Sequence, residues 1–107
     1  MEITGKCREE FKKWQHDCNW FEDFNIYNEN YRNIEIFYTL TPSMQYGVYV
    51  DFFDSVGINI TDYVRFYEIS CSGFVSDICE GKYHNKGRQY SRLKAIEKAN
   101  EIYNKHN

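Results

Sequence analysis

The sequence has one proline, six glycines and no low-complexity run, and it has no long apolar segment. Chains that stay disordered are usually rich in proline and glycine and poor in aromatic residues, so this composition favours an ordered chain. No stretch reaches the roughly 18 apolar residues that a membrane-spanning helix needs. The first residues, MEITGKCREEF, are charged, so we expect no secretion signal and a cytoplasmic location.

Cysteine and histidine are present without a metal-site pattern. No C-x-x-C pair occurs, and the histidines lie at no zinc-site spacing relative to the cysteines. In a cytosolic chain such cysteines are typically reduced, buried and used as small apolar side chains. We therefore expect neither a metal nor a cofactor. The residues in question are Cys7, Cys18, Cys71, Cys79, His16, His84 and His106.

What the sequence does have is aromatic residues, which make up 19% of its 107 residues. A chain of this length has room for one domain with one core, so residues 1–107 are expected to form a single domain. Residues 5–18 have the spacing of an amphipathic helix, with Thr4 at the N-cap position. Its apolar stripe consists of Cys7, Phe11, Trp14 and Cys18. Its solvent-facing side is expected to carry Arg8, Lys12 and Gln15.

A second helix is predicted between Thr41-Pro42, an N-cap followed by proline, and Gly57, which suits the residue after the last turn. Only one narrow face of this helix is polar, so it should be the buried central helix. That face consists of Gly47, Asp51, Asp54 and Ser55. The carboxylate pair has three possible uses: a solvated face, a charged contact to a basic partner, or acid–base or metal chemistry. No other residue at motif spacing supports the third use.

Residues 58–83 are rich in β-branched and aromatic residues and are predicted to form an antiparallel hairpin that turns at Ser72-Gly73. Residues 91–105 are predicted to form the last helix, with Ser91 as its N-cap. Its buried stripe is Ala95, Ile96, Ala99, Ile102 and Tyr103. Residues 19–40 have no clean period and are either a functional loop or packing over the core. The fold class is therefore α+β, with three helices packed on a small antiparallel sheet.

Charge is divided unevenly along the chain, whose net charge is −3. Residues 17–62 contain eight acids and one arginine, whereas residues 82–94 contain five bases and no acid. The basic run could hold phosphates while tyrosines stack on bases, or it could be a solvated loop. The candidate nucleic-acid-binding residues are Lys82, Lys86, Arg88, Tyr90, Arg92 and Lys94. The acidic, aromatic segment could instead contact a basic partner, through Trp20, Glu22, Asp23, Tyr27, Tyr31, Asp51 and Asp54.

Three stretches, ITGKCREEFKKW, SMQYGVYVDFFDSVGINI and SRLKAIEKANEIYN, resemble small uncharacterised proteins of Bacteroidetes phages and prophages. The likeness covers most of the chain and departs at residues 19–38. It includes no catalytic motif, so no residue inherits a role. Small phage proteins of this size are often counter-defence factors, including anti-CRISPR proteins.

The resemblance implies a non-enzymatic inhibitor that acts in the host cytoplasm. It would bind an RNA-guided defence nuclease, such as a type VI CRISPR effector, or its guide RNA, without contacting a membrane. The alternative is a nucleic-acid-binding accessory protein of phage replication that uses the basic run alone. An enzyme is the third hypothesis, and no nucleophile–base pair or phosphate loop in the sequence supports it.

Overall fold

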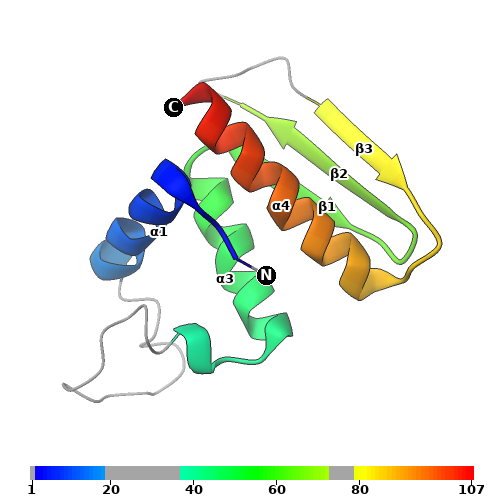
Figure 1. The fold of residues 1–107 in the computed structure, drawn as a ribbon, viewed down its shortest axis with the longest axis horizontal. Helices are drawn as coiled ribbons and strands as arrows, with labels where there is room; N and C mark the ends of the chain where they lie inside the picture. Colours follow the sequence, from blue (N-terminus) through cyan, green and yellow to red (C-terminus); the bar gives the residue numbers. More distant parts are fainter. Residues whose placement is uncertain (1, 19–36, 73–78) are drawn as a thin grey trace.

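The computed structural model describes residues 2–18, 37–72 and 79–107 (Figure 1). The described helices are α1 (Gly5–Cys18), α3 (Pro42–Ser55) and α4 (Arg88–His106), and residues 37–39 form a helical turn before α3. The strands are β1 (Ile58–Asp62), β2 (Phe66–Cys71) and β3 (Cys79–Tyr83).

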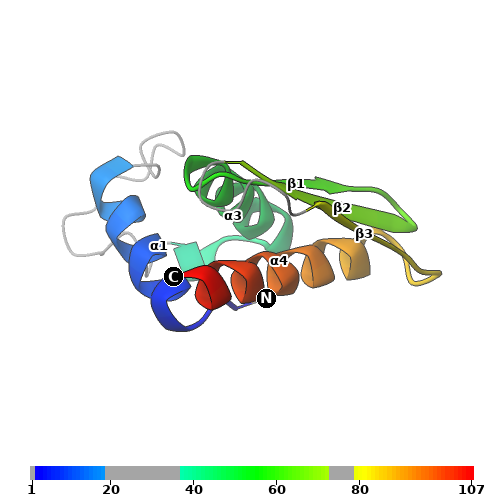
Figure 2. The ribbon, with the colours of Figure 1, turned by 90° about the horizontal axis from the view of Figure 1, so that it is seen from above.

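The three strands form an antiparallel sheet in the order β1-β2-β3. Helix α4 runs along one face of this sheet, and α1 and α3 lie toward one end of the molecule (Figure 2). The register places Ile60 opposite Ile69, and Ile69 is fully buried on the face toward α4. The next residue of β2, Ser70, belongs to the opposite face because side chains alternate along a strand. The α+β prediction, with helices packed on a small antiparallel sheet, is confirmed.

The predicted first strand is wrong in one respect, because residues 58–72 form two strands and not one. Residues 63–65 turn the chain, and the Tyr63 amide donates to the Phe66 carbonyl at 2.7 Å. The turn sequence, Tyr-Val-Arg, contains no glycine, proline or asparagine, the residues that usually mark such turns. Because aromatic and β-branched residues lie on both sides of this turn, the composition indicates one continuous strand.

Helix α1 buries most of the stripe that its spacing predicts. Cys7 and Phe11 are fully buried and Trp14 packs against them, whereas the Cys18 side chain lies outside the described part of the chain. Gln15 was expected on the solvated side, but it is buried. Because it lies one turn after Phe11, it shares the face of that residue.

The start of α1 is held by side chains of α4. Asn104 accepts a hydrogen bond from the Cys7 amide at 2.9 Å and donates one to the Thr4 carbonyl at 2.9 Å. Asn100 accepts from the Thr4 amide at 2.9 Å. The bonds to the Thr4 and Cys7 amides satisfy N–H groups that the start of a helix leaves without an intrahelical partner. We call Thr4, Asn100 and Asn104 the terminal clasp.

Helix α3 is the buried central helix that the sequence predicts. The Thr41 hydroxyl caps it by accepting from the Met44 amide at 3.4 Å, and Pro42 follows in the first turn. Gly57 ends it with a φ of +83°, where a side-chain Cβ would lie 2.2 Å from the Ser72 carbonyl oxygen. The buried residues are Tyr46, Val48, Tyr49, Phe52 and Phe53.

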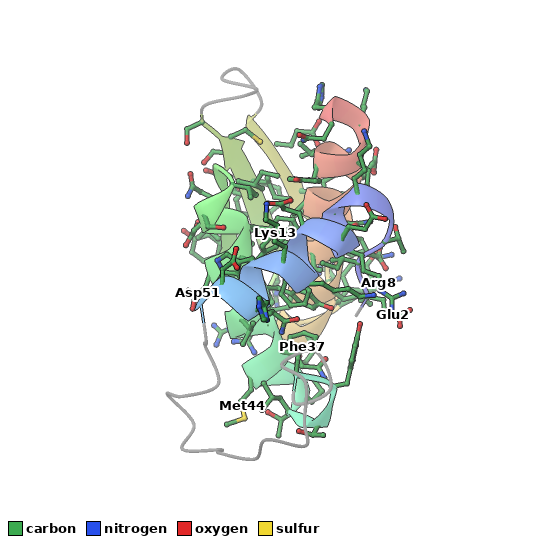
Figure 3. All side chains as sticks on the ribbon, turned by 90° about the vertical axis from the view of Figure 1, so that its left-hand side faces the viewer. Glu2, Arg8, Lys13, Phe37, Met44 and Asp51 are labelled. Carbon is green, nitrogen blue, oxygen red and sulfur yellow. The ribbon has the colours of Figure 1, made fainter. Side chains whose placement is uncertain are left out.

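The core is centred on aromatic rings where α1, α3 and residues 37–39 meet. The Phe11 ring centroid lies 5.1 Å from that of Phe37, 5.0 Å from that of Tyr49 and 5.2 Å from that of Phe52. All four side chains are at most 1% exposed. We call these four residues the aromatic hub, and Figure 3 shows Phe37 beneath α1. Aromatic residues therefore occupy the centre of the core.

Helix α4 begins three residues earlier than predicted, so Ser91 is not its N-cap. Gly87 holds that position with a φ of +88°, a conformation that suits glycine, and the Ser91 amide donates to the Gly87 carbonyl at 3.2 Å. The hydroxyl of Ser91 is buried and engaged elsewhere, as described below. The predicted buried stripe from Ala95 to Tyr103 is confirmed.

Two cysteines, Cys7 and Cys71, are buried in the core, as predicted. Burial raises the pKa of the Cys7 thiol from 9.0 to about 12. The side chains of Cys18 and Cys79 lie outside the described part of the chain. Among the helices of residues 2–18, 37–72 and 79–107, none has the length and apolar character needed to span a bilayer.

Candidate functional site

The basic run of residues 82–94 lies at one end of the sheet, which we call the distal end. There the β1–β2 turn, the last residues of β3 and the first turns of α4 meet (Figures 1 and 2). The His84 amide donates to the Arg65 carbonyl at 2.9 Å, which joins the β1–β2 turn to the segment after β3. The distal end therefore combines cations from the basic run with Arg65, which the sequence analysis did not select.

Two of the five cations of the basic run, Arg88 and Arg92, form ion pairs with Asp62, a carboxylate of the acidic segment. The Nε atom of Arg92 lies 3.4 Å from Asp62 Oδ2, and that of Arg88 lies 3.9 Å from the same oxygen. The guanidinium of Arg92 is also 5.0 Å from the Tyr46 ring centroid, and it donates to Ser43 Oγ at 3.2 Å. These contacts make Arg92 a link between α4, β1 and α3.

Tyr46 completes this network beneath the surface. Its hydroxyl donates to Asp62 Oδ1 at 2.7 Å. Burial, and then the hydrogen bond to Asp62, raise the pKa of Tyr46 well above its usual range. Asp62 therefore serves the interior as well as the two arginines, so the charge division of the sequence is partly balanced within the molecule.

The lysines of the run gather around Tyr90. The Nζ atom of Lys86 lies 5.0 Å from the ring centroid, and that of Lys94 lies 5.5 Å from it. Lys94 is also paired with Glu97 at 3.0 Å. A small pocket of about 150 Å³ opens between Tyr67, Lys82, His84, Tyr90 and Lys94. We call Lys82, Lys86, Tyr90 and Lys94 the lysine cluster.

Lys82 and Lys86 differ from the other cations of the run. Within the part of the chain that the structure describes, no carboxylate lies at ion-pair distance from either ammonium group. Both side chains are exposed. Of the predicted nucleic-acid-binding residues, these two therefore keep their charge available for an external anion.

A wider groove of about 550 Å³ continues from the lysine cluster along β3 and α4. Its walls carry both signs of charge, because Lys98 pairs with Glu80 at 3.2 Å and with Glu101 at 3.4 Å. An anion is therefore favoured at the lysine-rich end of the groove and disfavoured beside the three glutamates of its walls, Glu80, Glu97 and Glu101.

The structure reveals a serine–histidine contact that no spacing in the sequence predicts. His84 Nε2 is in hydrogen-bond contact with the buried Ser91 Oγ, and His84 Nδ1 accepts from the Lys86 amide at 3.1 Å. Because Nδ1 accepts a hydrogen bond, Nε2 carries the proton and donates to the serine. A general base would need the opposite arrangement. The contact instead fixes the segment between β3 and α4.

The predicted partner-binding residues do not join this site. Trp20, Glu22, Asp23, Tyr27 and Tyr31 lie outside the described residues. Asp51 and Asp54 are exposed near the end of α3, with Asp51 on the side of that helix away from α4 (Figure 3). Asp54 accepts from Asn59 Nδ2 at 2.9 Å, at the opposite end of β1 from Asp62.

Within residues 2–18, 37–72 and 79–107, no three or more His, Cys, Asp or Glu side chains are grouped so that they could hold a metal ion. Comparison with protein-family models, with curated proteins and with solved structures gave no match to this chain.

Proposed function

We propose that the protein binds nucleic acid through the lysine cluster at the distal end. The observation that carries this proposal is the position of Lys82 and Lys86, two exposed cations without a carboxylate partner among the described residues, on either side of His84 and close to Tyr90. Lysine ammonium groups bind backbone phosphates, and a neighbouring aromatic ring offers a surface for a base or a sugar.

The start of α4 supports the same function. Its N-cap, Gly87, makes no side-chain capping bond to the first turn. Within the described part of the chain, no side chain of the N-cap occupies the amides of that turn, and a helix N-terminus favours a negative charge. With Lys86 beside it, this turn could hold one phosphate while Lys82 holds another.

The net charge of −3 limits what such a site can do. Long-range attraction to a polyanion is weak, so binding depends on the local cations and should be sensitive to salt. If Lys82 and Lys86 neutralise two phosphates of a single strand, the log–log slope of affinity against salt should be about −1.4.

The test is a titration of fluorescently labelled RNA and DNA oligonucleotides, followed by anisotropy at 50 and 200 mM salt. Substitution of Lys82 and Lys86 by glutamate should abolish binding. The matched control replaces Lys12 and Lys13, two exposed lysines of α1, by glutamate, which changes the net charge by the same amount. Equal losses in the two variants, or no binding by the unmodified protein, would contradict the proposal.

We further propose that this binding serves inhibition of an RNA-guided defence nuclease, through contact with the nuclease, its guide RNA or both. The resemblance to phage proteins supports this role, and so does the exposure of Asp51 and Asp54, which suits contact with a basic protein surface. The absence of enzymatic activity stays a prediction.

Capture of a type VI effector from host lysate, with and without RNase, tests the inhibitory role. Charge reversal of Asp51 and Asp54 to lysine should reduce capture of the nuclease and leave oligonucleotide binding intact. Recovery of bulk nucleic acid without a nuclease would favour the accessory protein of phage replication.

A further inference from the structure

Three aromatic side chains form a row on the sheet face opposite α4, at the distal end. The ring centroids of Tyr63 and Phe66 are 6.0 Å apart with planes 25° from parallel. Those of Phe66 and Tyr83 are 4.5 Å apart with planes 31° from parallel. Tyr83 is 80% exposed and Tyr63 is 54% exposed. We call Tyr63, Phe66 and Tyr83 the aromatic ladder.

The position of Phe66 depends on a glycine in the neighbouring strand. A Cβ atom on Gly81 would lie 2.5 Å from the Phe66 ring, closer than two carbon atoms can approach. Glycine within a strand costs stability, and it often marks a place where another group must approach the backbone closely. Here Gly81 leaves room for the ring to lie across β3 and meet Tyr83.

At β3, Tyr83 of the ladder lies on one face of the sheet and Lys82 of the lysine cluster on the other. Lys82 pairs with Tyr67, which is buried toward α4, and Tyr83 pairs with Phe66 on the open face. Because successive side chains of a strand point to opposite faces, Lys82 and Tyr83 flank the edge of β3 that no other described strand pairs with. Arg65, exposed in the β1–β2 turn between Tyr63 and Phe66, adds a cation next to two ladder residues in the chain.

We propose that the aromatic ladder stacks the unpaired bases of a single-stranded nucleic acid whose phosphates lie at Lys82, Lys86 and Arg65. This inference rests on the proposed function and specifies its ligand as single-stranded. A base in a duplex has both faces covered by its neighbours, so it cannot stack on Tyr83. Glu68, exposed on the same face, disfavours phosphates over the middle of the sheet and confines the strand to the distal end.

The charge of the surroundings favours this ligand over an apolar protein segment. Stacking on an aromatic ring is available to every base, and it tolerates any sequence. Cations beside exposed rings match a ligand that carries flat rings and phosphates in alternation, which is the chemistry of a nucleic-acid strand. We therefore expect a preference for unpaired strands without strict sequence selectivity.

The experiment compares four probes by anisotropy: single-stranded RNA, single-stranded DNA, the duplex of the same sequence, and an abasic strand. Tyr83→Ala should weaken binding of the two single strands about ten-fold or more. It should leave the weaker binding of the duplex and the abasic strand unchanged. Tyr83→Phe, which keeps the ring, should restore the affinity.

Tyr38→Ala is the matched control, because Tyr38 is 41% exposed and lies in the helical turn at residues 37–39, away from the distal end. It should leave binding of every probe unchanged. Circular dichroism and thermal unfolding of each variant separate a loss of the ladder from a loss of the fold.

The outcomes distinguish this inference from the proposed function. If Lys82→Glu with Lys86→Glu abolishes binding but Tyr83→Ala changes nothing, or weakens duplex and single strand equally, the ladder does not stack bases and only this inference fails. If no probe binds the unmodified protein, both fail. If Tyr83→Ala instead turns a dimer into a monomer in sedimentation experiments, a second copy covers the ladder and the inference is overturned.

Discussion

The aromatic hub and the aromatic ladder use the same kinds of side chain in opposite ways. In the hub the planes of Phe37, Tyr49 and Phe52 are inclined to that of Phe11 by 77°, 40° and 66°. In the ladder the successive planes are 25° and 31° from parallel. The hub rings are almost completely buried, whereas two of the three ladder rings are more than half exposed.

The difference follows from what surrounds each group. Rings enclosed on all sides fill space by edge-to-face contact, which also suits the charge distribution of the ring. One pair at the margin of the hub, Phe11 and Trp14, is stacked at 18°, and Trp14 is only partly buried. The near-parallel row of the ladder ends at Tyr63 and Tyr83, which are 54% and 80% exposed. The aromatic residues of this chain therefore serve two purposes: some fill the core, and others form a row on the surface.

The largest effect is expected from truncating the hub. Phe52→Ala removes a fully buried ring that contacts Phe11, Trp14 and Phe53, and it should lower the free energy of unfolding by about 3–5 kcal/mol. Tyr83→Ala, at an exposed position, should change it by about 0.5 kcal/mol or less. Urea unfolding of the two variants measures both values. Similar losses would show that the ladder is part of the core.

An intermediate effect is expected at Gly81. Gly81→Ala places a methyl group against the Phe66 ring, which must move, so the free energy of unfolding should fall by about 1 kcal/mol. The near-ultraviolet circular dichroism should change because the contact between Phe66 and Tyr83 is disturbed. Gly47→Ala is the control, since nothing lies within 4 Å of its Cβ position on α3. The free energy of unfolding of that variant should rise by about 0.5–1 kcal/mol.

The smallest effect on stability near neutral pH is expected from the buried tyrosines, whose ionisation matters only at alkaline pH. Burial raises the pKa of Tyr46, Tyr49, Tyr67 and Tyr103 above the ordinary value of 10.0. These groups keep their protons in the folded state at a pH where the unfolded chain loses them. The unfolded state then binds fewer protons, so stability falls as pH rises above about 10.

Because of Cys7, stability should begin to fall at a lower pH than the tyrosines alone would give. The pKa of its thiol is 9.0 in the unfolded chain, and burial raises it to about 12 in the folded protein. Urea unfolding between neutral and alkaline pH measures the decline, and tyrosinate absorbance follows the titration. Stability that stayed constant through pH 11 would contradict the burial of these groups.

Periodicity was enough to predict the helices, because helical spacing reports which face meets the core. The sheet was predicted from the β-branched and aromatic content of residues 58–83, because these residue types favour strands. The burial of Phe52 and Phe53 followed from the single polar stripe of α3. Gln15 was misplaced because amide side chains are usually exposed, although its spacing from Phe11 put it on the buried face. The turn at residues 63–65 was missed because it lacks the residues that mark turns.

The candidate site was harder to predict than the fold. The basic run is visible in the sequence, but the pairing of Asp62 with Arg88 and Arg92 joins residues that only the tertiary structure brings together. The ladder could not be predicted without the strand register, since the face on which Tyr83 lies follows from its partner Phe66. The contact between His84 and Ser91 could not be predicted while Ser91 was taken as the N-cap, because α4 begins at Arg88.

The terminal clasp has a consequence for how the chain folds. Thr4 and Cys7 are bound by Asn100 and Asn104, residues nearly the whole sequence away. Contacts of such long separation are slow to form, because a large loop must close before they contribute. During synthesis the first turn of α1 waits without these partners until α4 has been made. We therefore expect the docking of α1 to be a late step, completed after α4 has packed on the sheet.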